Sequence, residues 1–163
     1  MGMCAEYLRL SESDVAHLQD ISAPAATREG GTAGLVGAEA KSIILRHFEN
    51  IADDDALDID TDWESLLMAL TGKPLDGQAL GDPLGEAILG ADRVCRDPLS
   101  SVIDADRVKV IAETLSTIDI DTRIEENGTG SDSADTVRTR FAQLAKFYAD
   151  TAHSGDAMLV TIE

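Results

Sequence analysis

The chain has 163 residues, with 13 Lys and Arg against 31 Asp and Glu, and a formal net charge of −18. This length suits one domain that buries its own core, and a hydrophobic content of 44% argues against global disorder. The negative charge repels phosphate backbones and anionic lipids, so neither nucleic acid nor a membrane surface is an expected partner. The charge favours a basic protein partner or cations, although solubility alone would also account for it.

The beginning of the sequence shows no targeting signal. The stretch "MGMCAEYLRL" lacks a basic region followed by an apolar run. No apolar run approaches the ~18 residues that a membrane helix needs. Cys4 and Cys95 are isolated in the sequence, which is typical of free thiols in a reducing compartment. We therefore expect a cytoplasmic protein without disulfides.

The N-terminal third predicts a strand, a short helix, a loop and a second helix. Met3–Leu10 partly alternates apolar and polar residues, as a strand does. Ser11 and Asp14 have the spacing of a capping box that opens the short helix. The Gly- and Ala-rich segment 22–37 predicts a flexible loop. Apolar residues between 40 and 51 then keep helical spacing.

A helix is expected to begin near Trp63, the only tryptophan. Trp63 starts a series of apolar residues at i, i+3, i+4 and i+7, which form one helix face. Thr61 and Glu64 have the T-x-x-E spacing of a capping box, so Thr61 is the expected N-cap. Gly72 is well placed to end the helix. Trp63 is therefore expected in the core, although an aromatic residue among acids would also suit a cationic ligand.

The stretch before this helix, "DDDALDIDTD" at residues 53–62, contains six aspartates. We expect residues 53–55 to be solvated turn residues. Asp58 and Asp60 are expected to lead into the helix just outside its cap, because acids are favoured near a helix N-terminus. In that position they would also be free to face a partner.

The same aspartates do not make a calcium loop. Asp58, Asp60 and Asp62 match positions 1, 3 and 5 of an EF-hand, whose carboxylates supply hard oxygen ligands. The next position requires Gly and is Trp63, and the last requires Glu and is Ala69. The three histidines are dispersed, with no Cys or His at ligand spacing to another. No metal and no cofactor is expected.

Catalytic motifs are equally scarce. The sequence has no nucleophile elbow, no P-loop and no dinucleotide-binding turn. Cys4 and Cys95 stay candidates for a nucleophile, since a catalytic His can be distant in sequence. The pattern favours a protein that is not an enzyme.

The second half of the chain predicts three more helices. In "DPLGEAILG" (Asp82–Gly90), Asp82 can cap a short helix, Pro83 suits its first position and Gly90 ends it. Asp104 is the expected cap of the next helix. A long helix is expected over Asp135–Ala152 from the spacing of its apolar residues.

Strands are expected at both ends of the chain. The segment Cys95–Val102 is ambiguous, with Pro98 arguing against a central strand. Glu126–Ser133 has the composition of a loop. Ala157–Ile162 is a short apolar run with β-branched residues, so we expect it to close the chain as a strand beside Met3–Leu10. The fold class is then α+β, a single domain of about six helices on a small mixed sheet of two to four strands.

Several motifs together resemble the YfbM-like family of small bacterial proteins, a domain of unknown function. They are "MGM" with Tyr7, "LDID..W..L...LTG" from Leu57 to Gly72, "DPL..A.LG", and a late "F..L..FY" before a terminal strand. The likeness covers nearly the whole chain. The family commonly has Lys where this chain has Thr61 and His where it has Leu67. The resemblance implies one cytoplasmic α+β domain over 1–163, without an established reaction.

Two functions follow as hypotheses. The first is a non-enzymatic acidic module that binds a basic protein partner, as an inhibitor or immunity protein would. The alternative is a small-molecule-binding protein or enzyme with a pocket near the Trp63 and Asp82 motifs. The candidate binding residues are Asp58, Asp60, Trp63 and Asp82. The chain is expected to be a monomer or a weak homodimer.

Overall fold

The computed structural model of the protein describes residues 2–16, 53–77, 81–96 and 99–163. The loop expected at 22–37 and the helix expected at 40–51 lie outside these residues. The short helix expected after Ser11 is present over residues 12–16, and its continuation lies outside the described part. Ser11 Oγ accepts the Asp14 N–H at 3.2 Å, so Ser11 caps this helix as predicted.

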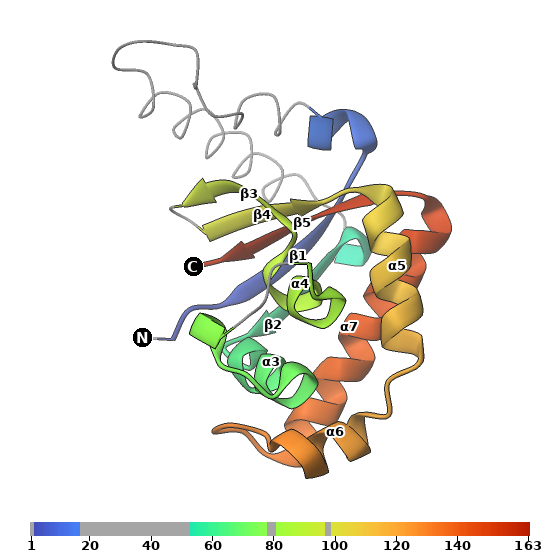
Figure 1. The fold of residues 1–163 in the computed structure, drawn as a ribbon. Coiled ribbons are helices and arrows are strands. Elements are labelled where there is room, and N and C mark those ends of the chain that lie inside the picture. Colours follow the sequence, from blue (N-terminus) through green and yellow to red (C-terminus); the bar gives the residue numbers. More distant parts are fainter. Residues whose placement is uncertain (1, 17–52, 78–80, 97–98) are drawn as a thin grey trace.

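Five strands form one sheet in the order β2-β1-β5-β4-β3 (Figure 1). The strands are β1 (Ala5–Leu10), β2 (Ala56–Asp60), β3 (Asp92–Arg96), β4 (Leu99–Ile103) and β5 (Ala157–Ile162). Neighbouring strands are antiparallel throughout. The α+β class is confirmed, while the expected mixed sheet of two to four strands is corrected to five antiparallel ones.

The two ends of the chain pair as predicted. β1 and β5 lie side by side, with Tyr7 opposite Val160. The ladder continues past both strands, because the Cys4 N–H donates to the Glu163 carbonyl at 2.6 Å and the Glu163 N–H donates to the Cys4 carbonyl at 3.0 Å. The terminal strands therefore lie inside the sheet, and among the described strands β2 and β3 are the outermost.

The helices that follow β2 in the chain pack on one face of this sheet (Figure 1). They are α3 (Trp63–Thr71), α4 (Pro83–Leu89), α5 (Ala105–Ser116), α6 (Ile120–Asn127) and α7 (Ala134–Ser154), with two short 3-10 turns, η1 (Asp53–Asp55) and η2 (Leu75–Gly77). The main core lies between helices and sheet. A second buried cluster, which includes Leu8, Leu159 and Val102, lies on the opposite sheet face.

Most predicted helix boundaries are correct. Asp82 caps α4 by accepting the Leu84 N–H, and Pro83 occupies the first position. Asp104 caps α5 through the Arg107 N–H at 2.8 Å. These caps could be read from sequence because each is a short polar residue directly before an apolar periodic run.

The predicted start of α3 is wrong. Thr61 is not the N-cap; that position is held by Asp62, whose side chain makes no capping hydrogen bond. Asp58 and Asp60 belong to strand β2 rather than to a helix lead-in. The chain turns at Asp60, which has a positive φ of 53° and whose carboxylate accepts the Thr61 N–H at 2.8 Å. A two-residue turn, Thr61 and Asp62, thus joins strand and helix, and Asp62 takes the cap position expected for Thr61.

Two buried tyrosines hold the C-terminal end of α4. Tyr7 on β1 donates its hydroxyl to the Ile88 carbonyl at 3.0 Å, and Tyr148 on α7 donates to the Ala87 carbonyl at 2.9 Å. Both residues are 0% exposed. The last carbonyls of a helix have no partner within it, so these hydroxyls satisfy groups that burial would otherwise leave unpaired. Burial raises the pKa of both tyrosines, which keeps the hydroxyls protonated as donors.

We expect Tyr7→Phe and Tyr148→Phe each to lower the free energy of unfolding by about 1–3 kcal/mol, because each leaves a buried carbonyl without its donor. Chemical denaturation measures this loss. Thr139→Ala is the control: Thr139 also donates its hydroxyl to a helix carbonyl, at 2.9 Å, but at an exposed position. Equal losses in the tyrosine variants and the control would contradict the prediction.

Candidate functional site

Four carboxylates gather at one end of the sheet, and we call them the acidic sheet end: Glu6, Asp58, Asp60 and Glu163. Glu6 lies opposite Asp58 across β1 and β2, and Ala5 lies opposite Asp60. Glu163 joins them through its backbone bonds to Cys4. None of the four forms an ion pair with a described base. The pairing of strands has therefore placed like charges together.

The Asp58 and Asp60 carboxylates also hold the local backbone. Asp58 Oδ1 accepts the Asp60 N–H at 2.6 Å. Asp60 Oδ1 accepts the Thr61 N–H and, at 3.3 Å, the Cys4 thiol. Both side chains are exposed. Each thus has a structural role through one oxygen while its charge remains open to solvent.

The electrostatic consequence appears at Glu6 and Cys4. Desolvation raises the pKa of the Glu6 carboxyl, and the nearby charges of Asp58 and Glu163 raise it further. The hydrogen bond to Asp60 is the main cause that raises the pKa of the Cys4 thiol, followed by desolvation and the neighbouring acids. A protonated thiol is a poor nucleophile. A bound cation would therefore reduce the repulsion among the carboxylates of the acidic sheet end. The raised pKa of the Cys4 thiol makes this residue badly suited to covalent catalysis.

Trp63 lies beneath this region and not on its surface. It is 1% exposed, and its indole Nε1 donates to the Met3 carbonyl at 2.8 Å. The expectation of a core residue is confirmed. Trp63 can affect the acidic sheet end only by positioning α3 and the segment before β1.

Asp82 lies apart from the other three candidate residues, at the start of α4. A hollow of about 640 Å³ lies along this helix, and we call it the α4 hollow. Its lining includes Gly81, Gly85, Glu86 and Leu89 on one side and Arg93 and Ser101 on β3 and β4. Glu86 is bound by the Arg107 guanidinium, which also donates to the Gly81 carbonyl at 3.0 Å. Asp82 shapes this hollow by fixing where α4 begins.

A second hollow, of about 370 Å³, lies along α3. Its lining includes Glu64, Ser65 and Met68 of α3, with Leu75 of η2 and Gly130 opposite. Leu75 also borders the α4 hollow, so η2 lies between the two. Each of the two sequence motifs thus has a surface depression beside it.

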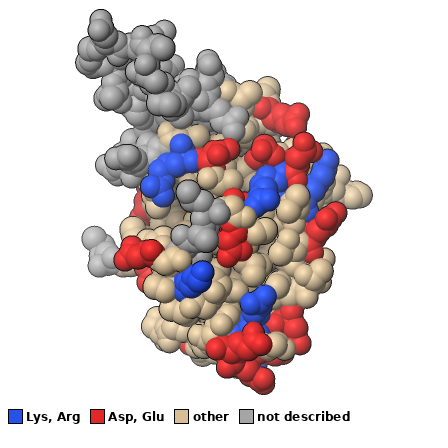
Figure 2. Space-filling view, in the orientation of Figure 1, with Lys and Arg blue, Asp and Glu red and all other residues tan. Residues whose placement is uncertain are grey.

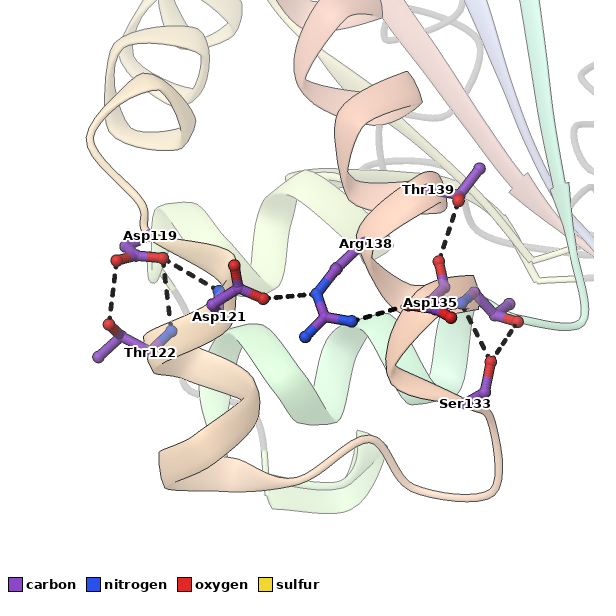
Figure 3. A network of polar contacts seen from close by, with 8 residues as sticks. Asp119, Asp121, Thr122, Ser133, Asp135, Arg138 and Thr139 are labelled. Carbon is purple, nitrogen blue, oxygen red and sulfur yellow. Dashed lines mark hydrogen bonds and ion pairs between the residues drawn. The ribbon is translucent and has the colours of Figure 1, made fainter.

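Most basic side chains in the described residues are already paired with acids: Arg9, Arg107, Lys109, Arg138, Arg140 and Lys146. Figure 2 shows such mixed charges side by side on one face. Arg138 lies between Asp121 of α6 and Asp135 of α7 (Figure 3). One guanidinium here contacts two carboxylates, so this group of three side chains has a net negative charge. Most described Lys and Arg side chains are therefore paired within the protein, and the excess Asp and Glu side chains have no basic partner among them.

The described residues contain no group of three His, Cys, Asp or Glu side chains placed to hold a metal ion. Among the same residues, no helix is long and apolar enough to cross a membrane. Cys4 is a free thiol.

Sequence reasoning missed four residues of these two regions: Glu6, Glu163, Arg93 and Ser101. The predicted pairing of the terminal strands was the one available signal for the first two. Arg93 and Ser101 come together only through the register of β3 and β4, where they lie opposite each other. No residue spacing in the sequence predicts the register of β3 and β4.

The comparisons with known proteins agree on the fold. A family model described as a domain of unknown function, DUF1877, matches residues 1–161. The crystal structure of YfbM from Escherichia coli, a protein of unknown function, superposes with a TM-score of 0.68. It is 17% identical, and the match covers 99% of this chain and 100% of that one, so the likeness concerns the fold alone. No curated protein matches the sequence.

We expect Asp58→Asn to lower the pKa of Glu6 towards its usual range. The raised pKa of Glu6 means that stability is fully present below its unfolded pKa of about 4.3 and is partly lost as pH rises through the folded pKa. As pH rises through that window, the variant should lose less of its free energy of unfolding than the unmodified protein does. The expected difference is about 0.2–1 kcal/mol, the effect of one pair of like charges on neighbouring strands. Asparagine keeps the oxygen that accepts the Asp60 N–H.

Carbon-detected NMR titration of Glu6, together with unfolding at several pH values, measures both effects. Glu125→Gln on α6 is the matched control, because it removes one exposed charge away from Glu6. An unchanged Glu6 titration in Asp58→Asn would contradict the expected coupling.

Proposed function

The chain belongs to the DUF1877 family of domains of unknown function, and we propose that it is a non-enzymatic module whose acidic sheet end binds a basic protein partner. An inhibitor or immunity protein would act in this way by masking a cationic surface. We propose the cytoplasm as the compartment. The observation that supports the proposal is the group of like charges at Glu6, Asp58, Asp60 and Glu163, which forms no ion pair with a base in the described residues.

The negative charge of the acidic sheet end is complementary to a basic partner, both because it is accessible and because its carboxylates repel one another. Asp58 and Asp60 are exposed, so a basic side chain reaches them without rearrangement of the fold. Because Glu6 is partly desolvated beside Asp58, a bound cation would also relieve an existing repulsion. Contacts of this kind guide association and are weakened by salt, since exposed charges are screened over about 8 Å at physiological ionic strength.

A second candidate function is the binding of a small molecule. The observation that favours it is the α4 hollow, whose volume of about 640 Å³ lies within the range of about 300–1,000 Å³ found for ligand sites. This function would not require the acidic sheet end.

A lysine-rich peptide tests the first proposal. We expect Asp58→Asn/Asp60→Asn to weaken its binding roughly twofold to thirtyfold, from about 0.2–1 kcal/mol for each exposed pair lost. Asparagine keeps the hydrogen-bond acceptors and tolerates the positive φ of Asp60, so the fold should persist. Calorimetry at two salt concentrations measures the affinity and its screening.

Glu125→Gln/Glu126→Gln on α6 removes the same charge from another exposed surface and is the control. Equal weakening by the two double variants would mean that only the overall negative field attracts the peptide. That result, or binding unaffected by salt, would overturn the proposed docking site.

A further inference from the structure

The α4 hollow contains two polar groups that the fold itself does not use. Ser101 is 4% exposed and lines the hollow, yet its hydroxyl makes no hydrogen bond to any other group in the described part of the chain. Its oxygen is also not among the fully enclosed unpaired atoms of that part. Buried hydroxyls are normally satisfied, so one that is unpaired and open to a hollow indicates an unfilled partner position.

Arg93 lies directly opposite Ser101 in the β3–β4 ladder. Opposed residues in an antiparallel pair project to the same face, with Cβ atoms about 4.5–5.5 Å apart. Arg93 forms no ion pair or hydrogen bond within the described residues, although the chain carries a large excess of acids. The register changes between Arg93 and Cys95, and bulges of this kind often redirect a side chain beside a functional site.

The end of α4 packs closely against Ser101. Gly90 has a φ of 78°, and a Cβ there would lie 2.4 Å from the Ser101 Cβ. Only glycine therefore allows α4 to end so close to β4 without displacing Ser101. Leu75, Leu89 and Ala91 add apolar surface to the same hollow.

The acids near the hollow leave its available charge positive. Glu86 is neutralised by Arg107, whose Nε is bonded to its carboxylate. Asp92 also lines the hollow, but it lies opposite Val102, whose side chain belongs to the cluster on the other sheet face. Because successive residues of a strand alternate in direction, the Asp92 side chain is directed away from Arg93.

We infer that the α4 hollow binds a small organic monocarboxylate, with Arg93 and Ser101 as its recognition residues. The guanidinium fork matches a carboxylate through two parallel hydrogen bonds, and the serine hydroxyl donates a third. The apolar part of the ligand lies against Leu75, Leu89 and Ala91. The net charge of −18 disfavours a more highly charged anion. This inference rests on the second candidate function and is independent of the acidic sheet end.

Phenylacetate is the probe, with phenylacetamide as its neutral isostere and phenethylamine as its cationic counterpart. Two-dimensional NMR of the amide groups locates binding, and titration gives the affinity. We expect phenylacetate to shift the amides of Gly90, Arg93 and Ser101 and to bind at least about tenfold more tightly than the amide or the amine, as a charge-assisted pair provides.

Arg93→Gln should weaken phenylacetate binding about tenfold or more and leave the weak binding of phenylacetamide unchanged. Arg123→Gln is the matched control, because Arg123 on α6 also has no ion pair in the described residues and does not line the hollow. Ser101→Ala should weaken phenylacetate severalfold. The amide spectra of the variants show whether each remains folded.

Equal weakening by Arg93→Gln and Arg123→Gln, or tighter binding of the amide or the amine in the hollow, would overturn the carboxylate inference but keep the second candidate function. If none of the three probes shifts the hollow up to about 10 mM, where a millimolar Kd would be visible, both are wrong.

Discussion

The packing of α4 against the sheet is the constraint on which the rest of the structure depends. Tyr7 from β1 and Tyr148 from α7 meet the last carbonyls of this seven-residue helix, and both hydroxyls are buried. A helix this short has little stability of its own, so its position comes from these tertiary bonds. Because they fix its end, they also fix the contact of Gly90 with Ser101 and hence the shape of the α4 hollow. The same two bonds join the first strand, the last helix and the core.

Charge is distributed by a second constraint, the shortage of cations. With 13 basic residues for 31 acids, most described bases are paired with acids of the same chain, and some connect helices, as Arg138 does between α6 and α7 (Figure 3). Exposed ion pairs of this kind contribute little stability, yet a base that is paired in this way is not available to a ligand. An unpaired arginine in such a protein is therefore more informative than an unpaired acid. Arg123 on α6 is likewise unpaired in the described residues, so the position of Arg93 in the α4 hollow, opposite the buried Ser101, is what points to a specific ligand. The acidic sheet end points only to a class of partner.

The sequence predicted the elements whose signal is local. The strand Ala157–Ile162 has the bounds expected, and the long helix expected over Asp135–Ala152 runs from Ala134 to Ser154. Strand β2 was missed because it is a short edge strand whose alternate residues are acids, a composition typical of loops as well as of protected edges. The left-handed turn at Asp60 then removed the expected Thr61 cap. The pairing of Arg93 with Ser101 lay beyond prediction, since a strand register is set by tertiary packing.

The two proposed sites use different strands of one sheet, which makes them separable. The acidic sheet end is formed by residues of β2 and β1 and by Glu163 after β5, whereas the α4 hollow is lined by residues of β3 and β4. No described residue belongs to both. Substitutions at sites without shared contacts usually add in free energy, so a change at Asp58 should leave the Arg93 site intact and the reverse. The two proposed functions therefore share no residue, and we expect each to be lost without the other.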